Sequence, residues 1–198
     1  MRCFLWLAPF LTLGPAAFGQ HLISFGIKGG VPFTDAFSDH TFLGVDTVTH
    51  SFSATKNYAV GPMLELRLPL GFSVEADALY RPLNLTVENR VIPTGATRFS
   101  ADVHSVEFPI LAKYHFLHAP LINPYIEAGP TFRTVGSSAS YLSDKGFVAG
   151  VGVDLKLLVL RISPEIRISR WGDDQRVTAF VPSPSNLNQA EFLIGLSF

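Results

Sequence analysis

Charged residues are scarce in this sequence: Asp, Glu, Lys and Arg make up 16% of its 198 residues, against about 25% in an ordinary soluble domain. The formal net charge is −1, so the chain lacks the basic excess that nucleic-acid binding requires. Cysteine occurs once, as Cys3, which excludes a disulfide within the chain. Long apolar runs are also missing, because Lys156 and Arg161 interrupt the most apolar stretch after the N-terminus. No later segment therefore has the pattern of a membrane-spanning helix.

The N-terminus has the pattern of an export signal. Arg2 supplies a positive charge, residues 3–13 are apolar, and Ala17-Phe18-Gly19 offers the small residues that precede a cleavage site. The apolar stretch is shorter than the roughly 20 residues that a spanning helix needs. We therefore expect residues 1–19 to be a cleaved signal peptide and residues 20–198 to form one mature domain.

The mature part alternates with a period of two. Between Arg161 and Ser169, charged and polar residues alternate with Ile162, Ile166 and Ile168, a separation of faces that a strand provides and a helix does not. The pattern predicts eight strands, over residues 22–31, 58–68, 72–83, 103–116, 124–134, 146–155, 158–169 and 190–198.

The predicted connections alternate in length, which is typical of an up-and-down barrel that crosses a membrane. Residues 33–57, 84–102, 135–145 and 171–189 form long loops, whereas residues 69–71, 118–123 and 156–157 form short turns.

Several positions conflict with regular strands. A ladder hydrogen bond must be lost, or a bulge formed, at each in-strand proline. These prolines are Pro62, Pro109, Pro130 and Pro164. Trp171 falls on the polar face of its strand, so we expect the strand to end or bulge before it.

Alternation alone leaves open which face is inside, because a soluble lipid-binding barrel has its apolar face inside. Three features favour a polar lumen: charges on the polar face nearly balance, glycines share that face, and aromatic residues lie near strand ends on the apolar face. We expect the lumen to contain a network of paired charges, formed by Lys28, Glu65, Arg67, Glu75, Asp77, Arg81, Glu107, Lys113, Glu127, Arg133, Asp154, Arg161, Glu165, Arg167 and Glu191.

The last predicted strand places Phe192, Ile194, Leu196 and Phe198 on one face. With the opening segment, residues 23–31, it resembles the OmpA-like or PorT-like outer-membrane β-barrels of Gram-negative bacteria. The resemblance implies an all-β, eight-stranded, antiparallel up-and-down transmembrane β-barrel with both termini in the periplasm. It also implies that the four alternate apolar residues are the signal read by the barrel-assembly machinery. No C-terminal peptidoglycan-binding domain is expected.

The sequence contains no convincing catalytic or metal-binding pattern. His104 and Ser105 are adjacent, so a strand points them to opposite faces, away from the mutual geometry that a catalytic trio needs. His115 and His118 are close in sequence, but no second ligand cluster supports a zinc site. We expect His115 at the rim of the lumen, paired with a carboxylate. No catalytic residue, metal or cofactor is predicted.

These observations predict a monomeric integral outer-membrane protein with a closed, salt-bridged lumen. It contacts membrane lipid through its wall, and its role is structural or interactive, through outer loops that bind an extracellular ligand. Binding residues commonly lie on loops held by a rigid scaffold. Three alternatives remain open: a narrow pore, a lipid-modifying enzyme of the outer membrane, and a soluble periplasmic lipid-binding barrel.

Overall fold

The computed structural model describes residues 22–36, 40–44, 47–53, 58–91, 95–117, 119–135, 143–157, 159–172 and 186–198. The predicted signal peptide, residues 1–19, lies outside these ranges. The described residues form the 3-10 helix η1 (Pro69–Gly71) and eleven strands: β1 (Ile23–Pro32), β2 (His40–Leu43), β3 (Thr47–Ser53), β4 (Ala59–Arg67), β5 (Phe72–Asp77), β6 (Leu79–Val91), β7 (Gly95–His115), β8 (Ile122–Val135), β9 (Lys145–Leu157), β10 (Leu160–Trp171) and β11 (Asn188–Ser197). In the part of the chain that they cover, no helix is long and apolar enough to cross a membrane.

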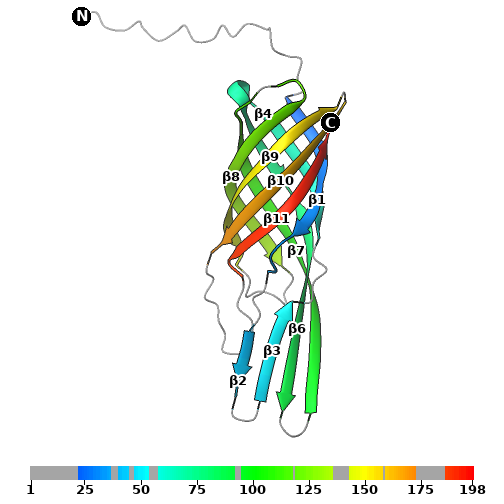
Figure 1. Ribbon diagram of the computed structural model, residues 1–198, viewed down its shortest axis with the longest axis vertical. Coiled ribbons are helices and arrows are strands. Elements are labelled where there is room, and N and C mark those ends of the chain that lie inside the picture. Colours follow the sequence, from blue (N-terminus) through cyan, green and yellow to red (C-terminus); the bar gives the residue numbers. More distant parts are fainter. Residues whose placement is uncertain are drawn as a thin grey trace, which may run out of the picture.

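The antiparallel sheet closes on itself to form a barrel (Figure 1). The closure is made by β1, which pairs with β11 on one side and with β4 on the other. One wall strand is built from two elements, β5 and the first part of β6, which meet at Ala78 and both pair with β7. The predicted eight-stranded antiparallel barrel is therefore confirmed.

The two ends of the barrel differ. One end, here called the short-turn end, carries η1, the connection between β7 and β8, and the turn between β9 and β10, together with the chain's C-terminus (Figure 1). Leu70 in η1 has a φ of 66°, which allows a tight reversal. The third short turn is shifted from its predicted place: Lys156 and Leu157 still belong to β9, so residues 158–159 connect it to β10.

Beyond the opposite end, a flat sheet projects from the barrel, here called the sheet extension. It consists of β2, β3 and the outer parts of β6 and β7 (Figure 1). The prediction of loops over residues 33–57 and 84–102 was wrong for these strands. The register of β6 and β7 runs unbroken from Leu79–Glu107 to Val91–Gly95. Thr47, Val48 and Thr49 in β3 and Thr86 and Val87 in β6 account for part of the difference, because β-branched side chains favour strands even where the composition is polar.

Apolar side chains face outward from the barrel and charged side chains face inward. Phe25 and Val151 are 65% and 56% exposed, whereas Lys28 and Arg167 are each 1% exposed. Exposed aromatic residues lie at both ends of the wall, with Phe72, Tyr114, Phe116 and Phe198 at the short-turn end and Tyr58, Phe132 and Phe147 at the other. A soluble lipid-binding barrel needs the opposite arrangement, so that alternative is wrong.

Trp171 contradicts the prediction that its strand ends or bulges before it. Strand β10 continues through Trp171, whose side chain is 1% exposed on the lumen side. The guanidinium carbon of Arg133 lies 3.6 Å from the centroid of the indole ring, and this cation–π contact gives a large ring a favourable place among charges. At Pro164 the β9–β10 ladder is interrupted, between Ile162 and Glu165, as a missing N–H requires.

Candidate functional site

The lumen is the candidate site, because the barrel strands direct their charged side chains into it. Successive residues of a strand point to opposite faces, so alternate positions of all eight wall strands meet inside. The charges form three layers, called central, extension-end and short-turn. The central layer contains Lys28 (β1), Glu75 and Asp77 (β5), Lys113 (β7), Glu127 (β8), and Glu165 and Arg167 (β10).

Arg167 is the hub of the central layer. Its guanidinium nitrogens lie 2.8 Å from Glu75 and from Asp77, 2.7 Å from Glu127 and 2.9 Å from Glu165. The guanidinium is a planar group with five N–H donors, and here it joins carboxylates from three strands. Removing a charge of this kind would leave several buried carboxylates short of a partner.

Two lysines complete the central layer. The ammonium of Lys28 contacts Glu75 and lies 2.9 Å from Glu165. The ammonium of Lys113 lies 2.6 Å from Glu75 and 4.3 Å from the centroid of the Tyr125 ring. The Tyr125 hydroxyl donates a 2.7 Å hydrogen bond to Glu165. Each buried cation is thus surrounded by acceptors, as enclosed charges require.

Glycines make room for these side chains. A Cβ atom at Gly152 would lie 2.4 Å from the Tyr125 hydroxyl oxygen, and one at Gly150 would lie 2.7 Å from a Glu127 carboxylate oxygen. A Cβ at Gly195 would lie 3.5 Å from Cε of Lys28. The sequence places small residues on the lumen face because an eight-stranded barrel is only just wide enough for its own side chains.

The extension-end layer is built on Arg81 and Arg133. Arg133 lies 2.8 Å from Glu107 and donates a hydrogen bond of 3.1 Å to the side-chain oxygen of Gln189. Arg81 lies 3.4 Å from Glu107 and 3.9 Å from Glu191. Beyond this layer, an apolar cluster of Ala36, Leu83 and Val103, with Val87 and Val135 packed against it, lies toward the sheet extension. Charged and apolar groups therefore both fill this end of the lumen.

The short-turn layer is built on Arg161, which contacts Glu65 and lies 3.2 Å from Asp154. Asp154 also accepts a 2.7 Å hydrogen bond from the Ser163 hydroxyl. His115 lies with Nε2 3.1 Å from Asp154 and Nδ1 3.2 Å from the Gly71 carbonyl oxygen. His115 therefore has the carboxylate partner at the rim of the lumen that the sequence predicts.

The structure places all of the predicted lumen charges on the inner face. All are buried except Arg67, whose side chain is 22% exposed at the short-turn end. Sequence reasoning missed Tyr125 and Gln189, which hydrogen-bond to lumen charges, and the lumen-facing Lys156. Strand parity was the signal that could have found them, because each lies an even number of residues from a predicted lumen charge on its own strand.

The central layer is also the only place in the described chain where the carboxylates gather as metal ligands would. Glu75, Glu127 and Glu165 each offer an oxygen, and these oxygens lie within 4.8 Å of one another. Lys113 and Arg167, however, contact all three residues. The positive charge that a metal would supply is therefore already provided by these side chains.

On β11, the predicted assembly signal lies on the outer face. Ile194 and Phe198 are 40% and 73% exposed, and Phe192 and Leu196 share their side of the strand. In the ladder, Phe192 pairs with Val31 of β1 and Leu196 with Ile27. The last strand therefore closes the barrel against the first and presents four apolar side chains outward.

A closed barrel with an apolar wall and a charged, ion-paired lumen defines a transmembrane β-barrel of the outer-membrane type. Residues 17–140 match the family described as outer membrane protein beta-barrel domain, and the chain belongs to this family. It is thus a protein of the bacterial outer membrane. No curated protein matches the sequence.

Two solved structures of outer membrane proteins align with most of the chain. The outer membrane protein OprG from Pseudomonas aeruginosa is 15% identical, with a TM-score of 0.55, over 88% of this chain and 92% of that one. OmpT of Vibrio cholerae, in its trimer form, is 10% identical, with a TM-score of 0.26, over 87% of this chain and 76% of that one. At these identities the likeness to OprG concerns the fold alone.

Proposed function

We propose that this protein is a monomeric, non-catalytic outer-membrane barrel whose lumen conducts no ions and whose sheet extension binds a partner outside the cell. The observation that supports the closed lumen is its filling by three layers of paired charges. Arg167 alone bridges carboxylates on β5, β8 and β10. Side chains that span the lumen in this way take the place of the water that a conducting path needs.

The sheet extension is the best candidate for an interaction surface. Extended connections on a rigid scaffold are where binding residues usually occur. Two exposed apolar side chains, Leu43 at 74% and Phe99 at 68%, accompany the exposed ion pair of Arg98 and Glu88, whose nitrogen and oxygen lie 3.6 Å apart. Aromatic residues and arginine are enriched in protein interfaces, and Phe99 and Arg98 are both exposed here.

We further propose that the chain belongs to the OmpA-like or PorT-like barrels, with both termini in the periplasm. Short turns on the periplasmic side and long connections outside are the rule for such barrels, and this chain has its short turns and C-terminus at one end (Figure 1). In this orientation β11 serves the assembly machinery, and membrane lipid covers the apolar wall.

The closed lumen is tested by conductance. The refolded protein, inserted into planar lipid bilayers, is expected to give no discrete current steps, while a trimeric porin under the same conditions verifies the sensitivity. Reproducible unitary steps would replace the proposed role with that of a narrow pore.

The orientation is tested with two epitope insertions, one between Val91 and Gly95 in the sheet extension and one between Leu157 and Leu160 at the short-turn end. An antibody is expected to bind the first on intact cells and the second only after the outer membrane is permeabilised. The reverse pattern would invert the proposed orientation and remove the sheet extension from the cell surface.

A further inference from the structure

The short-turn layer carries more positive than negative charge. It contains Arg67, Lys156 and Arg161 against Glu65 and Asp154. Arg161 contacts both carboxylates, and Arg67 shares the Glu65 carboxylate with it, with Nε at 3.7 Å. Lys156 makes no ion pair with any residue that the structure describes. Two cations are therefore incompletely neutralised at one end of the lumen.

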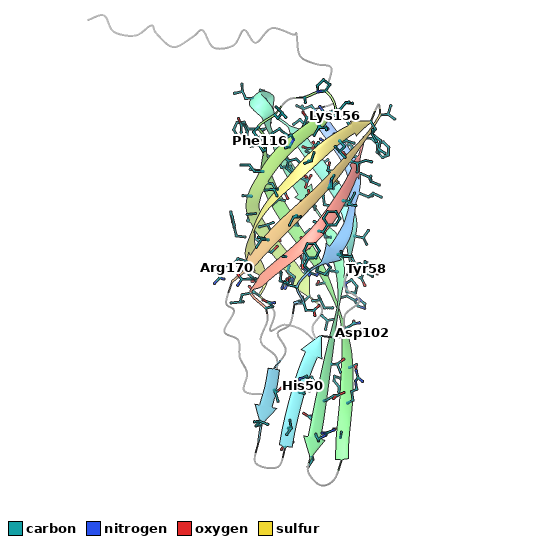
Figure 2. The ribbon with its side chains drawn as sticks, viewed as in Figure 1. His50, Tyr58, Asp102, Phe116, Lys156 and Arg170 are labelled. Atoms are coloured by element: carbon teal, nitrogen blue, oxygen red, sulfur yellow. The ribbon has the colours of Figure 1, made fainter. Side chains whose placement is uncertain are left out.

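Both cations lie where water reaches the lumen. Lys156 is two residues from the lumen-facing Asp154 on β9, so it shares its face, and it pairs in the ladder with Arg161. Figure 2 shows Lys156 at the short-turn end of the barrel. Arg67 is the last residue of β4, and its side chain is 22% exposed, against 6% for Arg161. Arg67 therefore lies nearer to solvent than the ion pair that closes the lumen behind it.

Buried polar atoms without hydrogen-bond partners lie in the same layer. They are the hydroxyls of Ser24 and Ser73, the side-chain nitrogen of Asn123 and one carboxylate oxygen of Glu65, all on residues at most 5% exposed. Ser24 pairs in the ladder with Glu65, Ser73 with Arg67, and Asn123 with Asp154. Three of these four groups can donate, and buried polar groups are normally satisfied, so an acceptor that enters this end of the lumen would find donors available.

We propose that the short-turn end of the lumen binds a small oxyanion, a phosphate or carboxylate group, from the aqueous phase. Arg67 and Lys156 supply the charge, and Asn123 and Ser73 supply buried hydrogen bonds. Charge-assisted hydrogen bonds to oxyanions are among the strongest in proteins. His115 takes no part, because Asp154 and the Gly71 carbonyl already occupy both ring nitrogens.

The ligand is a dissolved anion rather than a lipid headgroup, because these side chains face the lumen and the apolar wall separates them from the bilayer. The site also differs from the proposed outer interaction surface, which lies at the other end of the barrel (Figure 2). The anion site can therefore be tested independently of partner binding by the sheet extension.

The test uses the full mature barrel in an uncharged detergent at low chloride, titrated with inorganic phosphate and, separately, with acetate by calorimetry. We expect saturable binding of at least one of the two anions at a single site. Lys156→Gln is expected to weaken anion binding about tenfold, because one charge-assisted hydrogen bond is lost. Arg67→Gln should have a similar effect.

Lys145→Gln is the matched control, since Lys145 begins the same strand at the opposite end of the barrel and is exposed. It should bind the anion as the parent does, and the heat-dependent gel mobility of all variants verifies that they are folded. Two results would overturn the site: binding of neither anion, or equal weakening by Lys156→Gln and Lys145→Gln, which would indicate a nonspecific charge effect.

Discussion

Arg167 illustrates how a single residue organises the lumen. Its guanidinium is 1% exposed and contacts four carboxylates. We expect Arg167→Met to lower the free energy of unfolding by about 3–5 kcal/mol, because breaking a buried ion pair leaves uncompensated charge. Denaturant titration in detergent micelles measures this loss.

The same strand provides the control for that substitution. Arg170 lies three residues further along β10, is exposed, and donates a 2.7 Å hydrogen bond to Asn188. Arg170→Met should change the free energy of unfolding by no more than about 0.5 kcal/mol. If the two substitutions cost the same, the central layer does not stabilise the barrel as its contacts suggest.

Gly152 tests how tightly the lumen is filled. A Cβ there would lie 2.4 Å from the hydroxyl oxygen of Tyr125, so Gly152→Ala must displace the ring from its hydrogen bond with Glu165. Overpacking of this kind costs about 1–3 kcal/mol of unfolding free energy. Gly29→Ala, where the nearest atom would lie at 3.5 Å, should be nearly neutral in the same denaturant titration. A neutral Gly152→Ala would mean that Tyr125 has free space.

At the scale of the element, each wall strand meets a different environment along its length. Val151 and Leu157 of β9 point outward and are 56% and 53% exposed, but Val151 lies near mid-wall and Leu157 at the short-turn end. Val151→Arg should cost about 2–4 kcal/mol of folding free energy in bilayers, and Leu157→Arg at most about 1 kcal/mol. Equal costs from equilibrium unfolding in vesicles would contradict the membrane position of this wall.

The elements also differ in how far the sequence could predict them. β10 and β11 follow strict alternation, so their faces and most lumen charges were predictable from parity. The side chains that the structure describes in β2 and β3, and in β6 from Glu88 onward, are not buried, and without that contrast polar strands look like loops. Trp171 was misjudged because parity says nothing about partners: the Arg133 guanidinium that holds its ring comes from β8. Pairings across the lumen depend on shear and register, which the alternation of polar and apolar residues does not reveal.

The sheet extension is expected to be separable from the barrel. Val87 and Phe99 already face each other in the β6–β7 ladder, so an Asn-Gly turn can replace residues 88–98 and preserve the hairpin register. Because barrel closure uses other pairings, the shortened protein should still show heat-modifiable gel mobility and lose only its partner binding. Failure to fold would show that the extension contributes to barrel stability.

At the scale of the whole molecule, the lumen network joins segments that are far apart in sequence. Glu65 on β4 contacts Arg161 on β10, 96 residues away, and Glu75 on β5 contacts Arg167, 92 residues away. Such contacts form only when the barrel has closed in its correct register. The network therefore adds specificity to a wall whose apolar outer surface would tolerate several registers.

Enclosure also predicts how the molecule responds to salt. Raising sodium chloride from 0.1 M to 1 M shortens the Debye length from about 10 Å to about 3 Å and screens exposed charges. The central-layer side chains are at most 2% exposed, so ions cannot reach them while the barrel is closed. Salt also affects apolar burial in general, and the Arg167→Met variant measures that effect. After this shift is subtracted, we expect the urea midpoint of unfolding of the parent to stay unchanged. A midpoint that falls with salt in the parent alone would mean that electrolyte enters the lumen, which would revive the narrow pore as the protein's function.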